Sequence, residues 1–108
     1  MKTLENKIAL ITGSSRGLGK AMALHLAKLG AKIIVTYNSN KTAANNTVKE
    51  IESAGSEGFA VQLNTGKSET FDTFYVTVQI KLKEFWSTEC FDILVNNAGT
   101  ILRMPAAD

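Results

Sequence analysis

The chain has 108 residues, 44% of them hydrophobic and 20% charged, with a formal net charge of +2 at pH 7. Such a length and composition predict one domain over residues 1–108, and the charge balance excludes the strongly basic surface of a nucleic-acid-binding protein. A small molecule is therefore the expected partner. One cysteine and one histidine leave no internal disulfide and no zinc site built from these ligands, so no metal is expected.

The first apolar run, Ile8–Ile11, is too short for a signal-peptide core or a membrane span. With Cys90 as the single thiol, we therefore expect a cytoplasmic protein that does not contact a membrane. A continuous apolar run that ends before Gly13 is typical of a strand buried on both faces, so residues 7–12 are predicted to form a strand.

Beyond the glycines that follow, apolar residues recur at intervals of three and four. This spacing predicts a helix that starts near Arg16 and ends at Gly30. Its buried face is predicted to consist of Leu18, Met22, Leu26 and Leu29.

The rest of the chain alternates between the same two patterns. Short apolar runs predict strands at 32–37, 59–63 and 91–95. Between them, helical spacing predicts a helix bounded by Asn40 or Ser39 as N-cap and by Gly55, and then a longer helix from about 68 to 86.

Strands that alternate with helices of this length imply parallel pairing through right-handed crossovers. The predicted fold class is therefore α/β, a Rossmann-type doubly wound parallel sheet with the order βαβαβαβ. Ligands of such sheets bind outside the carboxyl ends of the strands, where the strand order reverses. Loops 12–19, 36–41, 64–66 and 96–99 are predicted to meet at that edge.

The first of these loops has the context of a phosphate-binding turn, because it joins a strand to a helix. The free amides and the positive dipole end of a helix N-terminus attract a pyrophosphate. Gly13 is predicted to turn the backbone, Gly17 to admit the ligand and Gly19 to pack the helix against the strand. Ser14 and Ser15 can add hydroxyl donors. The spacing G-x-x-x-G-x-G differs from a Walker A loop, and by itself it is equally consistent with a purely conformational role.

Two segments together resemble the short-chain dehydrogenase/reductase family: Thr12-Gly13-Ser14-Ser15-Arg16-Gly17-Leu18-Gly19, and Asp92-Ile93-Leu94-Val95-Asn96-Asn97-Ala98-Gly99. Residues 7–13 are most similar to its 3-oxoacyl-[acyl-carrier-protein] reductase branch. The resemblance covers nearly the whole chain. It implies the dinucleotide-binding, N-terminal portion of an oxidoreductase that moves hydride between a nicotinamide cofactor and a carbonyl or alcohol.

The resemblance also implies which residues contact the cofactor. The pyrophosphate and adenosine phosphate would meet Gly13, Ser14, Ser15, Arg16 and Leu18, and the riboses would meet Asn97, Ala98 and Gly99. Where the family usually has an acidic residue beside the adenine, this chain has Asn64 and then Thr65, and the amide of Asn64 can form a comparable hydrogen bond.

Cofactor preference is predicted from the end of the second strand, where a carboxylate would bind the ribose 2′-hydroxyl and repel a 2′-phosphate. Tyr37, Asn38 and Ser39 offer no acid, and Arg16 and Lys41 offer positive charge. We therefore expect NADP(H) to be preferred, with NAD(H) possible. The alternative is that both cations are solvated surface charges.

No catalytic residue is predicted within the chain. The resemblance implies a catalytic Ser, Tyr and Lys beyond Asp108, and Tyr37 with Lys41 lies at the adenosine end of the site. The chain is expected to be truncated after the fourth strand, as an incomplete gene model or an excised half, and to be inactive alone. Ile93 and Val95 would then line a hydrophobic sheet edge. The full-length protein is expected to be a homo-oligomer.

Two other functions fit the residues less well. One is a non-catalytic dinucleotide-binding module that senses cofactor or dimerises. The other is a Rossmann-type enzyme of different chemistry, such as methyl transfer from S-adenosylmethionine, whose ligand carries no pyrophosphate.

Overall fold

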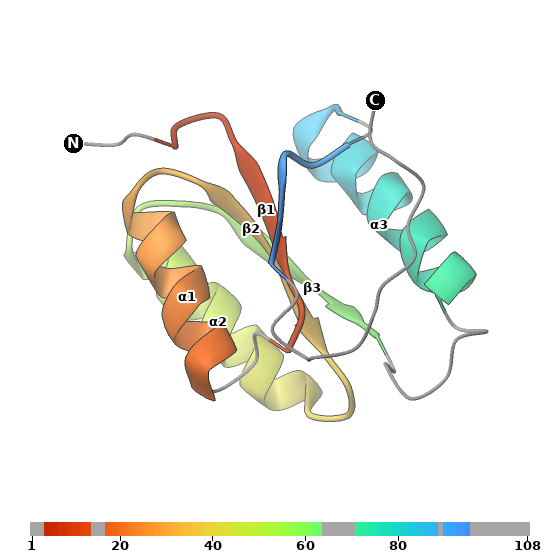
Figure 1. Ribbon diagram of the computed structural model, residues 1–108, viewed down its shortest axis with the longest axis horizontal. Helices are drawn as coiled ribbons and strands as arrows, with labels where there is room; N and C mark the ends of the chain where they lie inside the picture. The colour runs from red at the N-terminus through yellow and green to blue at the C-terminus, as the bar shows by residue number, and fades with distance from the viewer. Residues whose placement is uncertain (1–3, 14–16, 64–70, 89, 96–108) are drawn as a thin grey trace.

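A four-stranded parallel sheet forms the centre of the computed structural model, which describes residues 4–13, 17–63, 71–88 and 90–95. Strands and helices alternate in the predicted order, which confirms the α/β class (Figure 1). The bounds are β1 Ile8–Ile11, α1 Gly17–Lys28, β2 Lys32–Tyr37, α2 Lys41–Ser53, β3 Gly58–Gln62, α3 Phe71–Trp86 and β4 Ile93–Val95.

The strand order is β3-β2-β1-β4, so β1 lies between β2 and β4. Ile11, the last residue of β1, is in register with Val35 on one side and Val95 on the other. The chain first builds the sheet outward from β1 to β3, and then returns to add β4 on the opposite side. This reversal beside β1 is the doubly wound topology predicted from the sequence.

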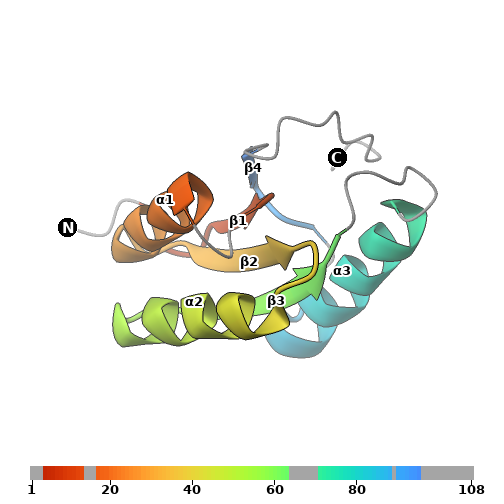
Figure 2. The same cartoon turned by 90° about the horizontal axis from the view of Figure 1, so that it is seen from below.

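Helices cover both faces of the sheet. Figure 1 shows α1 and α2 on one face and α3 on the other, and Figure 2 shows α1 and α2 lying side by side. Successive side chains of β1 therefore enter two different cores: Ala9 and Ile11 pack with α1 and α2, whereas Ile8 and Leu10 pack with α3. Burial on both faces explains why the strand is a continuous apolar run.

The predicted buried face of α1 is wrong. Gly19, Ala23 and Ala27 are the buried residues of this helix, whereas Leu18 is 70% exposed. Met22, Leu26 and Leu29 are only half-buried. The small residues recur at intervals of four, so they form one continuous face. They let the helix backbone lie close to the sheet, whereas Met22 and Leu26 pack at the margin of the same core.

The other two helices agree better with their predicted patterns. Asn40 is the N-cap of α2, because its side-chain oxygen accepts a hydrogen bond of 2.9 Å from the amide of Ala43. In α3, Phe74, Val78 and Leu82 are buried on one face of the helix.

Phe85, near the end of α3, is 54% exposed. Its ring stacks on Phe59 of β3 at 5.5 Å between centroids. Trp86 meets the same ring at 5.0 Å. These aromatic side chains therefore close the rim of the core under α3.

β4 begins at Ile93, two residues later than predicted. Asp92 precedes the strand, and its backbone amide donates to the carbonyl of Ile8 at 2.8 Å. Its carboxylate in turn accepts the Ile8 amide at 2.9 Å. The carboxylate of Asp92 thus accepts the hydrogen bond that a backbone carbonyl would accept in a longer strand. β4 forms one edge of the described sheet, with Leu94 44% exposed.

Within the described ranges, no helix is both long and apolar enough to cross a membrane.

Candidate functional site

The loop from β1 to α1 lies at the carboxyl edge of the sheet, beside the point where the strand order reverses. Its two described ends have the same unusual backbone conformation. Gly13 has φ of 62° and Gly17 has φ of 63°, both in the left-handed region that side chains disfavour. The geometry therefore favours glycine at two of the three positions singled out in the sequence.

Gly17, the first residue of α1, is exposed, and a Cβ built on it would have no heavy atom within 4 Å. The first turn of α1 carries no acidic residue. A helix N-terminus whose first residue leaves its Cβ position open, and whose own first turn has no acidic side chain, suits an anionic group. Gly19, by contrast, is buried, as expected for a residue that lets the helix approach the strand.

The start of the loop is held by the neighbouring strands. The amide of Gly13 donates to Oγ1 of Thr36, on β2, at 2.9 Å. The same hydroxyl donates to the carbonyl of Ile11 at 3.0 Å. On the other side, the amide of Thr12 donates to the carbonyl of Val95 at 3.0 Å. Both threonine side chains are buried.

Thr36 is a site residue that sequence reasoning missed. It follows Ile33, Ile34 and Val35, and a β-branched residue in such a run reads simply as a strand former. The available signal was its place at the end of the strand beside the glycine loop, where a buried hydroxyl needs a partner.

The end of β2 brings a second group of predicted residues to the same edge. Asn38 and Lys41 are exposed, and Lys41 begins α2. The carbonyl of Asn38 accepts a 2.9 Å hydrogen bond from the side-chain amide of Gln62, at the end of β3. Tyr37 and Ser39 complete a segment without a carboxylate.

The remaining predicted contacts lie outside the described residues. They are Ser14, Ser15, Arg16, Asn64, Thr65, Asn97, Ala98 and Gly99. Their roles, like the cofactor contacts of Gly13, Leu18, Asn38 and Lys41, stay predictions.

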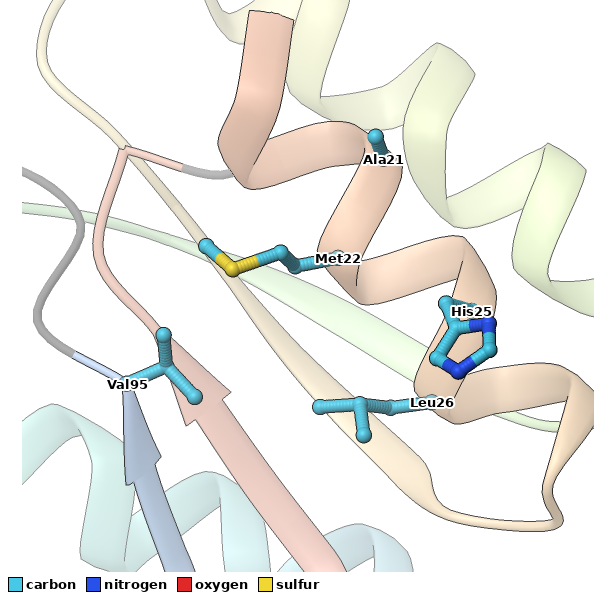
Figure 3. A pocket seen from close by; sticks show the side chains of 5 residues that line it. All are labelled: Ala21, Met22, His25, Leu26 and Val95. Atoms are coloured by element: carbon cyan, nitrogen blue, oxygen red, sulfur yellow. The ribbon is translucent and has the colours of Figure 1, made fainter.

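An apolar hollow of about 390 Å³ lies between α1 and the edge strand β4. Met22, Leu26 and Val95 point into it, whereas Ala21 and His25 form its rim on α1 (Figure 3). His25 is exposed, and the described part of the chain contains no cluster of three residues that could hold a metal ion. The α1 side of the hollow is lined by Met22 and Leu26, two half-buried residues of the predicted apolar face of this helix.

A doubly wound sheet with a glycine turn at its switch point defines a Rossmann-type domain. The family model described as "short chain dehydrogenase" matches residues 7–108. The chain therefore belongs to the short-chain dehydrogenase family.

Curated relatives agree with this assignment. A 3-oxoacyl-[acyl-carrier-protein] reductase from Synechocystis sp. is 41% identical over 113 aligned residues, which cover 100% of this chain and 43% of that protein. The chain thus spans less than half of this relative. The short-chain dehydrogenase/reductase homolog YusS of Bacillus subtilis is 38% identical over 104 residues, which cover 95% of this chain and 89% of YusS.

Solved structures show the same fold. Landomycin C-6 ketoreductase LanV, crystallised with bound NADP and rabelomycin, matches 90% of this chain with a TM-score of 0.85 and 38% identity. The match covers 40% of the LanV chain. The reductase LugOII, which catalyses keto-reduction at C1 during lugdunomycin biosynthesis, matches 87% of this chain and 38% of its own, with a TM-score of 0.82 and 40% identity.

Proposed function

We propose that this chain is the NADP(H)-binding part of a reductase that transfers hydride between the cofactor and a carbonyl or alcohol. The observation that carries the proposal is the pair of left-handed glycines, Gly13 and Gly17, at the N-terminus of α1. Gly17 adds no side chain at the first residue of the helix, and the position of its missing Cβ is open, at the switch point of the sheet. A pyrophosphate is the anion that this position suits in a Rossmann-type domain.

The cofactor, when bound, supplies or accepts the hydride, and the residues of this chain bind and orient it. The glycine turn would hold the pyrophosphate through backbone amides, with Ser14, Ser15 and Arg16 adding polar and charged groups. Asn64 and Thr65 would contact the adenine, and Asn97, Ala98 and Gly99 would line the path between the two riboses.

The preference for NADP(H) is supported by the end of β2. Asn38 and Lys41 are exposed there, and residues 37–39 include no carboxylate that would repel a 2′-phosphate. LanV, which shares the fold at 38% identity, was crystallised with NADP. NAD(H) remains a second ligand at lower affinity.

The activity of a whole protein of this kind would require a catalytic Ser, Tyr and Lys that we place outside the 108 residues, so that this chain alone is inactive. A small-molecule ketone or alcohol would be the substrate, and a homo-oligomer would be the assembly. The names of the reductase relatives support this class of substrate. The single thiol, Cys90, is free and exposed, which fits a place in the reducing cytoplasm.

Fluorescence titration of the purified chain with NADPH and with NADH tests the proposal. We expect NADPH to bind more tightly, and we expect Lys41→Ala and Arg16→Ala each to weaken NADPH by about three- to fivefold while leaving NADH within about twofold. Lys49→Ala is the matched control, because Lys49 is an exposed lysine further along α2. If the folded chain binds neither dinucleotide at millimolar concentration, the proposal is refuted.

One finding favours a second candidate, a dinucleotide-binding module without catalysis. The chain covers 89% of YusS, so a curated relative of similar length exists. Incubating NADPH and a panel of small ketones with a longer protein that carries this sequence separates the two functions, because this chain alone is expected to be inactive under both. Binding without consumption of NADPH by any protein that contains this sequence would favour the module.

A further inference from the structure

We propose that Thr36 is a positioning residue for the glycine turn, whose hydroxyl fixes the backbone at Gly13 so that the loop is ready to receive a dinucleotide. The inference rests on the proposed function and connects a residue of β2 to the glycine turn that follows β1. Thr36 itself would touch no part of the ligand.

The contacts place one hydroxyl between two parts of the loop. Oγ1 of Thr36 accepts the Gly13 amide at 2.9 Å and donates to the Ile11 carbonyl at 3.0 Å. Ile11 pairs with Val35, the residue before Thr36, so the side chain carries the contact between β1 and β2 past the last paired residues. The hydroxyl therefore joins the end of the strand to the start of the turn.

The position of Thr36 makes these hydrogen bonds effective. The residue is 1% exposed, so little water competes for its hydroxyl, and a buried hydrogen-bonding group without a partner is costly. The residue that it holds, Gly13, has φ of 62° and few side-chain restraints of its own. A hydroxyl from a rigid strand thus restrains the most freely rotating residue at the start of the loop.

Such a restraint would favour ligand binding because the backbone at Gly13 is held before the ligand arrives. A loop that must be ordered on binding lowers the measured affinity by the cost of that ordering. The Gly13 amide is already engaged within the fold, so its contribution would be conformational.

The side-chain chemistry gives a sharp test, because valine has the shape of threonine without its hydroxyl and serine keeps the hydroxyl. We expect Thr36→Val to weaken NADPH binding about five- to tenfold and Thr36→Ser to stay within twofold of the wild type. Thr47→Val is the matched control. Thr47 is 0% exposed, and its hydroxyl donates at 3.1 Å to the Ala43 carbonyl inside α2.

Two measurements separate positioning from simple stability. Denaturation gives the loss of stability in each variant, and hydrogen exchange of the Gly13 amide gives its protection. We expect both valine variants to lose stability, but only Thr36→Val to lose affinity and Gly13 protection. If the wild type binds NADPH and Thr36→Val binds it with the same affinity, the inference is overturned and the proposed function stays intact. A wild type that binds no dinucleotide would overturn both, and equal loss in Thr36→Val and Thr36→Ser would overturn the role of the hydroxyl.

Discussion

The two faces of the sheet are both buried, but they are packed with side chains of very different size. Under α3 the core contains large groups such as Phe59, Phe74 and Leu82. Under α1 and α2 the helices contribute mainly alanine, as at Ala23 and Ala27. Small residues allow a helix to approach the strands closely, and large ones hold it further away.

This difference in side-chain size follows from where each helix begins relative to the sheet. α1 begins directly after the glycine turn, so its N-terminus must lie against the end of β1. α3 enters the structure at Phe71 on the other face and has no such constraint in the described residues. The face that positions the candidate site is therefore the one with little room for substitution, whereas the other face gains its stability from buried volume.

The largest effect is expected where the core is filled by a large side chain. Leu82→Ala should lower the free energy of unfolding by about 3 kcal/mol, because it leaves a cavity under α3. Ile80→Ala on the same helix should change it by less than about 0.5 kcal/mol, since Ile80 is 58% exposed. Urea denaturation measures both. Similar losses for the two variants would contradict the assignment of the faces of α3.

The opposite substitution tests the other face. Ala23→Leu should cost about 2 kcal/mol, because a larger side chain forces α1 away from the sheet. NADPH affinity should fall as well, since the start of α1 would move. Ala21→Leu is the control, because Ala21 is exposed on the same helix. Normal stability in Ala23→Leu would show that α1 does not need its close approach.

A third change separates backbone conformation from open space. Gly17→Ala should cost about 1 kcal/mol, because φ of 63° disfavours a side chain even though a Cβ meets no atom within 4 Å. Asparagine tolerates this conformation better, so Gly17→Asn should recover most of the stability. Its side chain would still occupy the space in front of the helix. We therefore expect calorimetry to show recovery in Gly17→Asn and titration to show weakened NADPH binding in both variants.

The smallest effect is expected from the ion pair between Lys20 on α1 and Glu50 on α2. Both side chains are partly exposed, so Lys20→Ala should cost no more than about 0.5 kcal/mol. The cost should shrink as salt is added. Denaturation at low and high salt, with Lys49→Ala as the control, measures it. A salt-independent loss would point to the packing of the lysine stem instead.

Much of the fold could be predicted because buried parallel strands appear in the sequence as short, continuous apolar runs. The runs around Ile8 and Ile33 have no polar interruption, and glycines mark the ends of α1 and α2. The face of α1 was mispredicted because hydrophobicity was taken as the measure of burial. Gly19, Ala23 and Ala27 have the same helical spacing as the leucines, and their small size was the signal that mattered.

The candidate site was less accessible to prediction. Gly13 and Gly17 could be identified because a left-handed backbone selects for glycine. The role of Thr36 depends on a contact between residues 23 positions apart, and local patterns carry no record of it. A strand residue acquires such a role only when the sheet brings β1 and β2 together.

The place of β1 at the centre of the sheet also affects how the protein is made. Ile8 bonds with Asp92, a separation of 84 residues. At the usual rates of synthesis, the first strand waits roughly 4–17 s for its partner to be translated. During that time the edge of β1 that later pairs with β4 has no partner strand, and pairing over such distances in sequence is slow. Cells that express this chain strongly should therefore show a greater need for chaperones than its small size suggests.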